Sequence, residues 1–474
     1  MSFKPVILWT DGMIFLLLAL AVAGIWWIRQ RPHLLLPWQR LARSRVGMVS
    51  ALILSLFVLT GLLDTLHYRP ALTGSHENGK SAYSTEVVSV LDLILTDLRS
   101  HTEKTYSAPL SAYLYAKESL QHADGKIVRE FPRLKFGGAH LAIPEQELDG
   151  DVFKRTIRGI FAGWVSGMLL VLLIVSVAAA RSRVKVRDWV EARRGSPLNA
   201  VFATIVLLAI LFGVVAHLAG AYHVLGTDKV GIDVLYLSLK SIRTGLVIGT
   251  VTTLVMLPFA IFLGIAAGYF RGWVDDVIQY VYTVLSSIPS VLLIAAAVLM
   301  MQITIEKHAE WFSSSAERAD LRLLFLCMIL GVTSWTSLCR FLRGEALKLR
   351  EMEYIQAAQA FGVSSLRILS RHILPNVMHI VLITVVMDFS SLVLAEAVLS
   401  YVGVGVDPST NSFGTLINNA RLEMGREPMV WWTLVSAFSF MLVLVLAANL
   451  LADAVRDAFD PRLNRAQTAQ EGEA

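Results

Sequence analysis

The chain contains little charge and almost no cysteine. Only 17% of its 474 residues are Asp, Glu, Lys or Arg, whereas 55% are hydrophobic, and the mean hydropathy is +0.59. This composition excludes an ordinary soluble globular protein and predicts an all-α polytopic membrane protein. The two cysteines, Cys327 and Cys339, lie in one apolar segment. We interpret both as packing residues, because this placement indicates neither a disulfide framework nor a Cys/His metal cluster.

Candidate catalytic and metal-binding groups are also scarce. His101, His122 and His140 lack the tight ligand spacing of a metal site. Residues 74–81, GSHENGKS, match the P-loop pattern, but residues 68–72 contain Pro70 and do not read as the buried strand that such a loop follows. We expect an ordinary turn-rich loop there. We also expect no catalytic residue, no metal site and no cofactor bound by this chain.

Long apolar runs are what the sequence has in abundance. A membrane helix needs about 20 apolar residues to cross about 30 Å of hydrocarbon. The runs predict nine spans, at residues 8–28, 47–66, 159–180, 200–218, 243–269, 275–301, 321–342, 378–403 and 430–452.

Basic residues lie beside these runs, so the net charge of +5 indicates membrane topology and not nucleic-acid binding. The loop between the first two spans has no acid and carries Arg29, Arg31, Arg40, Arg43 and Arg45, and the loop between the third and fourth spans is also basic. The positive-inside rule therefore predicts that both loops are cytoplasmic. Alternation then places the N-terminus outside and the C-terminus inside.

Residues 67–158 differ from the rest, with twelve Lys or Arg and twelve Asp or Glu. They predict a small external (periplasmic) domain, with helices at 84–98 and 108–120 and a strand within 126–136, while its fold stays open. The predicted organisation is 1–66, two N-terminal spans; 67–158, external insertion; 159–218, two additional spans; 219–463, core; and 464–474, a disordered tail.

Two kinds of residue stand out inside the spans. Gly159, Gly163 and Gly167 share one helix face, which allows close helix approach; we favour packing within the bundle over a dimer motif. Asp388 and Glu396 lie eight residues apart, and intramembrane acids usually face a polar interior. Both are possible pathway-lining residues, the alternatives being a packing contact for Asp388 and a solvated structural role for Glu396.

The charged stretch 345–375 interrupts the apolar chain. Its helix formers, Gly362 and the capping residues Ser364 and Ser365 predict a helix-turn-helix, with Pro375 stopping the second helix. Taken alone, the stretch reads equally as a solvated amphipathic linker or as a docking element for a soluble partner.

This stretch resembles the EAA loop of ABC-importer permeases. Ala357 and Ala358 are followed by three residues, Gly362, nine residues, and then the sequence HILP ending at Pro375. Gln356 stands where Glu is usual, and His372 where an apolar residue is common. The resemblance implies an ATPase-coupling loop that uses Glu353, Ala357, Ala358, Gly362, Leu374 and Pro375.

Three further segments resemble the C-type subunit of dipeptide, oligopeptide and nickel importers. Residues 223–235, HVLGTDKVGIDVL, resemble the LGTDxxGRDVL signature, with Ile232 in place of the usual Arg and with the external motif residues Gly226, Thr227, Asp228, Gly231 and Asp233. Residues 399–406 and 449–463 are similar to later family segments. The N-terminal region is then enlarged, and either 47–66 or 200–218 corresponds to the family's first helix.

The resemblance implies a type I importer permease core in the bacterial inner membrane, working by alternating access. Its implied partners are a second permease subunit, two cytoplasmic ATPases that bind ATP-Mg, and a soluble or lipid-anchored binding protein. Di- or oligopeptides are the implied substrates. Nickel chelates or another small solute are alternatives, and a membrane sensor that uses the external domain is a third.

Overall fold

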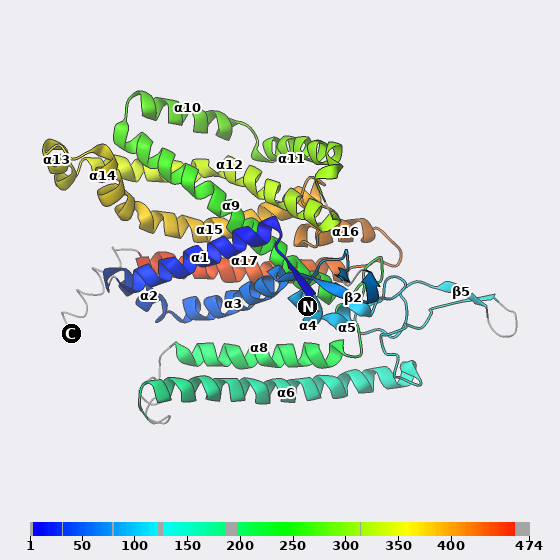
Figure 1. Ribbon diagram of the computed structural model, residues 1–474. Coiled ribbons are helices and arrows are strands. Elements are labelled where there is room, and N and C mark those ends of the chain that lie inside the picture. The colour runs from blue at the N-terminus through cyan, green and yellow to red at the C-terminus, as the bar shows by residue number, and fades with distance from the viewer. Residues whose placement is uncertain are drawn as a thin grey trace.

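The computed structural model describes residues 3–30, 32–77, 80–121, 127–184, 197–312 and 314–459. Its long helices run alongside one another as an elongated bundle (Figure 1). Within the described residues, nine helices are long and apolar enough to cross a membrane, as the sequence predicts. The predicted disordered tail at 464–474 and the basic residues of 185–196 lie outside the described ranges.

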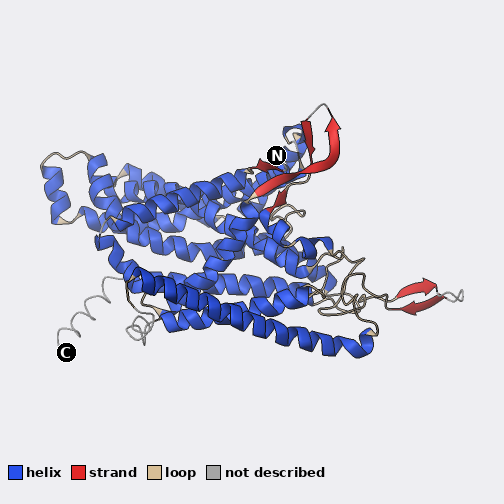
Figure 2. Ribbon diagram, turned by 60° about the horizontal axis from the view of Figure 1, so that its bottom comes forward, coloured by secondary structure: helices blue, strands red, loops and turns tan. Residues whose placement is uncertain are grey.

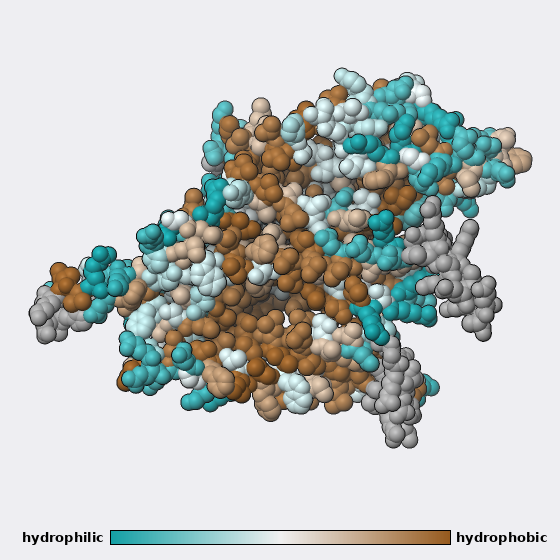
Figure 3. Space-filling model, turned by 180° about the vertical axis from the view of Figure 1, so that it is seen from behind, coloured by the Kyte–Doolittle hydropathy of each residue, from teal (hydrophilic) through white to brown (hydrophobic). Residues whose placement is uncertain are grey.

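The membrane-length helices expose mainly apolar side chains, which form a broad belt on one face of the molecule, hollowed near its middle (Figure 3). They are α1 (Trp9–Arg29), α3 (Arg45–Thr65), α6 (Pro144–Arg181), α8 (Leu198–Ala219), α9 (Val234–Phe270), α11 (Ser290–Lys307), α12 (Ser315–Arg350), α15 (Leu374–Tyr401) and α17 (Trp432–Phe459). The shorter helices are α2 (Pro32–Leu41), α4 (Val90–Ile94), α5 (Thr96–Ser100), α10 (Trp273–Ser287), α13 (Glu353–Ala360), α14 (Ser365–Ile368) and α16 (Phe413–Glu423), with a 3-10 turn at Ala309–Trp311.

The strands gather at one end of the bundle, called here the insertion end, and α13 projects at the other, called the α13 end (Figures 1 and 2). Strand β2 (His67–Glu77) pairs antiparallel with β1 (Phe3–Val6), β3 (Lys80–Tyr83) and β4 (Val88–Ser89). A second hairpin, β5 (Glu118–Gln121) with β6 (Ile127–Glu130), extends away from the body (Figure 2).

The strands settle several predictions for residues 67–158. The described residues of the P-loop-like pattern, 74–77 and 80–81, lie on strands β2 and β3, whereas a P-loop lysine opens a helix. The strand predicted within 126–136 is confirmed by β6. The helix predicted at 108–120 is wrong, because Pro109 is followed by Leu110 at a φ of 56° and the chain turns there. The segment predicted as a helix at 84–98 contains β4, α4 and the start of α5.

Helices α9 and α12 form the centre of the bundle, and each has about half of its most apolar stretch buried. Helix α3 packs against both α9 and α17, whereas α8 packs chiefly against α6 and touches the bundle through α3. Helix α3 is therefore integrated into the bundle, whereas α8 lies at its periphery. Helix α6 also runs unbroken through residue 158, so the predicted domain boundary falls inside it.

Glycines bring α6 and α8 into close contact. A Cβ atom added at Gly159 would lie 2.6 Å from the Val214 Cα, and one at Gly163 would lie 2.5 Å from the Ile210 Cα. Such spacing leaves room only for hydrogen at these positions. The interpretation of this glycine face as packing within the chain is confirmed.

Replacing Gly163 with valine should therefore push α6 and α8 apart. Overpacking of this kind typically costs about 1–3 kcal/mol, and here the cost falls on a peripheral helix pair. We expect a cysteine pair placed across α6 and α8 to cross-link more slowly in Gly163→Val, with the bundle still folded. Gly24→Val in α1 is the matched control, since a Cβ at Gly24 has nothing within 4 Å. Equal cross-linking in both variants would contradict the packing assignment.

The span predicted at 275–301 is wrong as a single helix. The chain forms α10 and α11 instead, separated at Ile288 and Pro289. Proline lacks an N–H and disfavours a helical conformation in the residue before it, and Ile288 is accordingly extended, with a ψ of 130°. The break places Ser286, Ser287 and Ser290 beside a cavity described below.

A buried ionic network joins α1 to the centre of the bundle. Arg243 of α9 donates to Asp11 Oδ1 at 2.6 Å and lies 3.5 Å from Asp320 of α12. His67 Nδ1 lies 2.8 Å from Asp11 Oδ2, and Thr10 donates to Asp320 through its backbone and its hydroxyl. All four carboxylate oxygens of the two acids therefore have partners, and the network fixes α1 against α9 and α12.

Candidate functional site

The external family motif, residues 226–233, forms a tight turn against which the insertion packs. Gly226 and Gly231 have φ values of 71° and 81°, which glycine adopts without strain. Asp228 accepts from the backbone N–H of Val230 and Ile232, and Asp233 caps α9 by accepting from Leu235 N at 2.8 Å. The motif residues thus shape the turn from which α9 begins.

Glu103, Thr105 and Ser107 of the insertion form hydrogen bonds with this turn. The Ser107 backbone N–H donates to Thr227 Oγ1 at 2.6 Å, and Thr227 donates to the Thr105 carbonyl at 2.9 Å. The Glu103 N–H donates to the Gly231 carbonyl at 2.9 Å. These hydrogen bonds therefore attach residues 103–107 to Thr227 and Gly231 of the motif.

The apolar side chains of the insertion also pack on the bundle. Tyr106 belongs to a buried cluster with Val234, Val430 and Trp432. Leu95 and Leu98 pack against the same buried apolar cluster as Ile232, the residue that stands where the resembled family carries Arg. The apolar side chain of Ile232 suits this apolar cluster.

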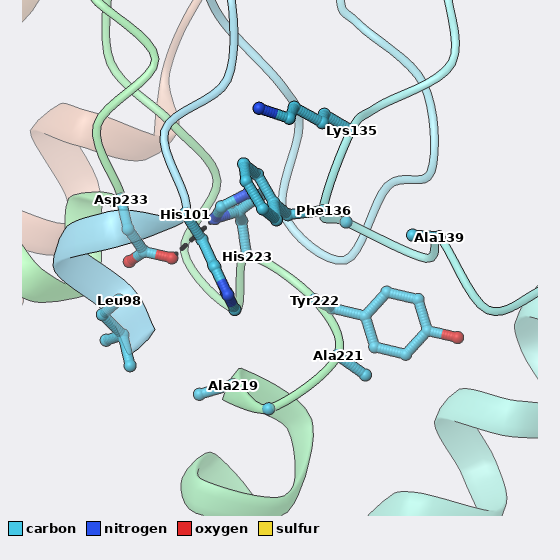
Figure 4. Close-up of a pocket in the computed structure, with 12 residues that line it drawn as sticks. Leu98, His101, Lys135, Phe136, Ala139, Ala219, Ala221, Tyr222, His223 and Asp233 are labelled. Atoms are coloured by element: carbon cyan, nitrogen blue, oxygen red, sulfur yellow. Dashed lines mark hydrogen bonds and ion pairs between the residues drawn. The ribbon is translucent and has the colours of Figure 1, made fainter. Parts of the chain in front are cut away.

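A charged cluster of Glu103, His223 and Asp233 strengthens the attachment of the insertion to the motif. The carboxylate of Glu103 accepts from the backbone N–H groups of residues 135–137, and His223 Nε2 lies 3.5 Å from its Oε1. His223 Nδ1 lies 2.8 Å from Asp233 Oδ2. Figure 4 shows this pair beside a cavity of about 100 Å³, with His101 stacked on Phe136.

The cluster shifts both pKa values. Burial opposes the charged forms but is outweighed. The hydrogen bond to Asp233 and the nearby carboxylate of Glu103 raise the pKa of His223 to about 9, and the nearby His223 ring and the hydrogen bonds from three backbone N–H groups lower the pKa of Glu103 to about 2. At neutral pH the cluster therefore holds a protonated His223 beside an ionised Glu103.

The stability of the attachment between the insertion and the motif should consequently depend on pH. A raised histidine pKa stabilises the fold fully below the unfolded value of 6.5, and that contribution is lost as the pH rises through about 9. A lowered Glu103 pKa contributes above 4.5 and is lost as the pH falls through about 2. We expect hydrogen-exchange protection of residues 103–107 to decline between pH 7 and 9.5, after correction for intrinsic exchange. The decline should be absent in His223→Gln, and an identical decline there would contradict the assignment.

At the other end, the loop 345–375 forms a short projecting module. Helix α13 follows α12 directly, and Ile355, Ile368 and Ile373 are each fully buried in one cluster with residues of α9, α12 and α15. Three anchors in so short a segment hold the module rigidly on the bundle.

Gly362 forms the turn after α13. Its φ is 73°, its N–H donates to the Gln359 carbonyl, and the Val363 N–H donates to the Ala358 carbonyl. This pair of bonds is a Schellman motif, which favours glycine at the left-handed position. A Cβ at Gly362 would have nothing within 4 Å, so the outer face of the turn is open.

The prediction that Pro375 stops the second helix is wrong. Helix α14 passes through a π-helical segment, Leu369–Ile373, directly into α15, and Pro375 lies in the first turn of α15. The wider π turn accommodates the proline without ending the helix. The module is therefore connected to the membrane span by continuous helix, and Leu374 and Pro375 lie at the junction.

The surface of the module contains two apolar residues, Phe361 and Leu366, that are not among the predicted coupling residues. Phe361 is 88% exposed and Leu366 is 76% exposed. Among the predicted residues, Glu353 and Ala357 are exposed on α13, and Ala358 packs partly on the core. The sequence signal for Phe361 was its place beside the turn glycine.

Between the two ends lies a polar cavity of about 690 Å³. Its lining comes from the α10–α11 break, α12 and α15, and it includes Asp388 and Arg340. Asp388 thus lines a cavity that is partly open at the surface.

Glu396 has a different environment. It is 2% exposed, and its Oε1 accepts from the hydroxyls of Ser400 at 2.6 Å and Ser412 at 2.8 Å. Ser412 also caps α16, so Glu396 joins α15 to α16. The expectation of a solvated Glu396 is wrong, and Glu396 is not among the residues that line the described cavity.

The apolar bundle, its open and partly polar cavity and the projecting module at one end are typical of a multi-pass membrane permease. Residues 260–465 match the family described as binding-protein-dependent transport system inner membrane component. The chain belongs to this family of ABC-importer permeases, which are not themselves enzymes.

Two relatives and one solved structure illustrate the match. The oligopeptide transport system permease protein OppC of Mycobacterium tuberculosis is 32% identical over 242 residues, which cover 51% of this chain and 77% of OppC. The glutathione transport system permease protein GsiD of Pectobacterium atrosepticum is 32% identical over 241 residues, covering 51% and 73%. A structure of the MetNI methionine ABC transporter covers 48% of this chain and 98% of its own, at 14% identity and a TM-score of 0.35.

Proposed function

We propose that this chain is a permease subunit of an ATP-driven, binding-protein-dependent importer of di- or oligopeptides in the bacterial inner membrane. It forms half of the translocation path, and a second permease subunit forms the other half. Two cytoplasmic ATPases bind ATP-Mg, and a soluble or lipid-anchored binding protein delivers the substrate. The chain itself contributes no cofactor.

The observation that carries this proposal is the rigid attachment of the projecting module. Ile355, Ile368 and Ile373 join it to the bundle, and continuous helix joins it to α15. A push on α13 is therefore transmitted to the spans that line the cavity. Closure of the ATPases against Ala357, Gly362 and the exposed Phe361 tilts these spans and alternates access to the path.

Peptides are the substrates that the relatives favour. The two relatives are named for transport of oligopeptides and of glutathione, which is itself a small peptide. Neither name supports a nickel chelate, and no observation here favours the sensor alternative.

We assign the insertion end to the outer side of the membrane and the α13 end to the cytoplasm. The N-terminal strand β1 lies with the insertion, whereas α17 ends toward the α13 end, where it packs against α2 (Figure 1). Helix α2, which contains Arg40 and directly precedes Arg43, also lies toward the α13 end (Figure 1). This placement supports the predicted orientation, with the N-terminus outside and the C-terminus inside. It also exposes residues 67–158 to the binding protein, and we regard α1, the insertion and the α6–α8 pair as additions to the family core.

The proposed coupling is tested with Gly362→Asp in the assembled complex. The open position accepts the side chain, and aspartate tolerates positive φ better than most residues, so the change mainly adds charge to the ATPase-facing turn. We expect ATP hydrolysis to continue while peptide uptake falls at least about tenfold, which corresponds to about 1.4 kcal/mol of lost coupling. Gly362→Asn is the uncharged control. If Gly362→Asp hydrolysed ATP and imported peptide at wild-type rates, the coupling assignment would be wrong.

A further inference from the structure

The polar cavity has the size and lining of a binding site. Its volume of about 690 Å³ lies within the usual range of about 300–1,000 Å³ for small-molecule sites. Hydroxyl groups dominate its polar lining, which comprises Ser286, Ser287, Ser290, Thr333, Ser334, Thr336, Ser337 and Ser391 together with Arg340 and Asp388.

Several of these hydroxyls are arranged as acceptors. Ser287 donates to the Val284 carbonyl at 2.7 Å, Thr333 to the Ile329 carbonyl at 2.9 Å, and Ser391 to the Asp388 carbonyl at 2.8 Å. Each donor proton is thereby used within its own helix, and the oxygen lone pairs remain free. A lining rich in free acceptors favours a ligand that donates hydrogen bonds, such as an ammonium group.

The carboxylate of Asp388 adds a negative charge to the same space. In the described parts of the chain, no residue forms a hydrogen bond or an ion pair with this carboxylate. An unpaired acid inside a membrane span is costly, and such acids face cavities or substrate paths. A cationic ligand would remove this cost while it occupies the cavity.

Arg340 supplies the opposite charge without neutralising Asp388. Its guanidinium donates to Ser286 Oγ at 3.3 Å and lies 5.4 Å from the centre of the Tyr282 ring. Within the described residues, Arg340 and Asp388 form no ion pair, although both line the cavity. Two charges of opposite sign on one cavity wall suit a ligand that carries both an ammonium group and a carboxylate.

We propose that this cavity is a peptide-binding station in the translocation path, where Asp388 binds the terminal ammonium group of a peptide and Arg340 binds its carboxylate. The proposal rests on the proposed function, because it places a substrate site in the same path. It assigns recognition of peptide termini to the permease itself, in addition to any selection by the binding protein.

The test uses the complete complex in proteoliposomes, with binding protein saturated in turn by trialanine, N-acetyl-trialanine and trialanine amide. We expect Asp388→Asn to slow trialanine uptake about tenfold with little change for N-acetyl-trialanine. Arg340→Gln should slow trialanine but spare trialanine amide. Asp453→Asn, an exposed acid on α17 away from the cavity, is the matched control and should behave as wild type.

The outcomes separate this inference from the function on which it rests. If the wild-type complex imports none of the three peptides, the proposed function fails. If wild type imports them and Asp388→Asn slows all three equally, or none, the station is wrong. Loss of the second permease subunit from purified Asp388→Asn would instead identify Asp388 as a subunit contact and overturn the inference. Asp388→Ser, which matches the hydroxyl lining, provides a second uncharged variant, and failure of both to assemble counts against the station.

Discussion

Phe361→Ser is expected to weaken binding of the ATPase subunits by about 30- to 1,000-fold while leaving the permease folded. Phe361 is 88% exposed at the turn after α13, whereas the anchors beneath it, Ile355 and Ile368, are fully buried. An exposed aromatic ring on a rigid element is typical of an interface hot spot, where truncation costs about 2–4 kcal/mol. Because the ring contributes little to the packing of this chain, the loss should fall on the partner interface.

The measurement is the affinity of purified ATPase for the permease pair in detergent or nanodiscs, together with peptide uptake. Phe131→Ser is the matched control, because Phe131 is 47% exposed near the β5–β6 hairpin at the insertion end. Its effect on ATPase affinity should be within twofold. Equal affinities for Phe361→Ser and wild type would show that the ATPase does not bind this face of the module.

Arg243→Met is expected to produce the largest loss of stability, about 3–5 kcal/mol in the free energy of unfolding. The side chain of Arg243 lies 2.6 Å from Asp11 and 3.5 Å from Asp320, and both acids are almost completely buried. Removing the guanidinium leaves two carboxylates without their main countercharge. The hydrocarbon of methionine fills part of the space but cannot offset the charge.

Equilibrium unfolding in mixed micelles, followed by tryptophan fluorescence, measures this loss. Arg426→Met is the control, because the Arg426–Glu423 pair is i,i+3 and largely exposed on the arginine side, and such surface pairs typically contribute about 0–1 kcal/mol. The double variant Arg243→Met with Asp11→Asn should recover part of the stability, since it removes one unpaired charge. A loss for Arg243→Met no larger than that for Arg426→Met would show that the network contributes little.

Local signals in the sequence identified much of the fold and part of the candidate site. Apolar run length determined the number of spans, because crossing hydrocarbon sets a minimum helix length. The Gly362 turn was predictable, since a glycine after a good helix former at that spacing is a helix stop. The glycine face of α6 was predictable as a close-packing surface for the same local reason.

Features that depend on distant partners were not predictable. Asp11, Arg243 and Asp320 meet from three helices, and no local pattern connects them. Glu103 and His223 lie 120 residues apart in the chain, and they form an ion pair only because the insertion packs against the motif. The pairing of α3 with α9 and α17, which places α6 and α8 at the periphery, also depends on packing between distant segments.

By itself, the sequence determined that this is a polytopic membrane protein with a charged helix-turn-helix, because hydropathy, charge asymmetry and turn chemistry are local properties. The permease class followed from the resemblance of its motifs to a known family. Only the tertiary structure decided what the individual acids do. Asp388 and Glu396 share one helix and are both acids. Among the described residues the carboxylate of Asp388 has no partner and lines a cavity, whereas that of Glu396 accepts hydrogen bonds from two serines. The helix places them, but the neighbours that pack around each side chain determine its role.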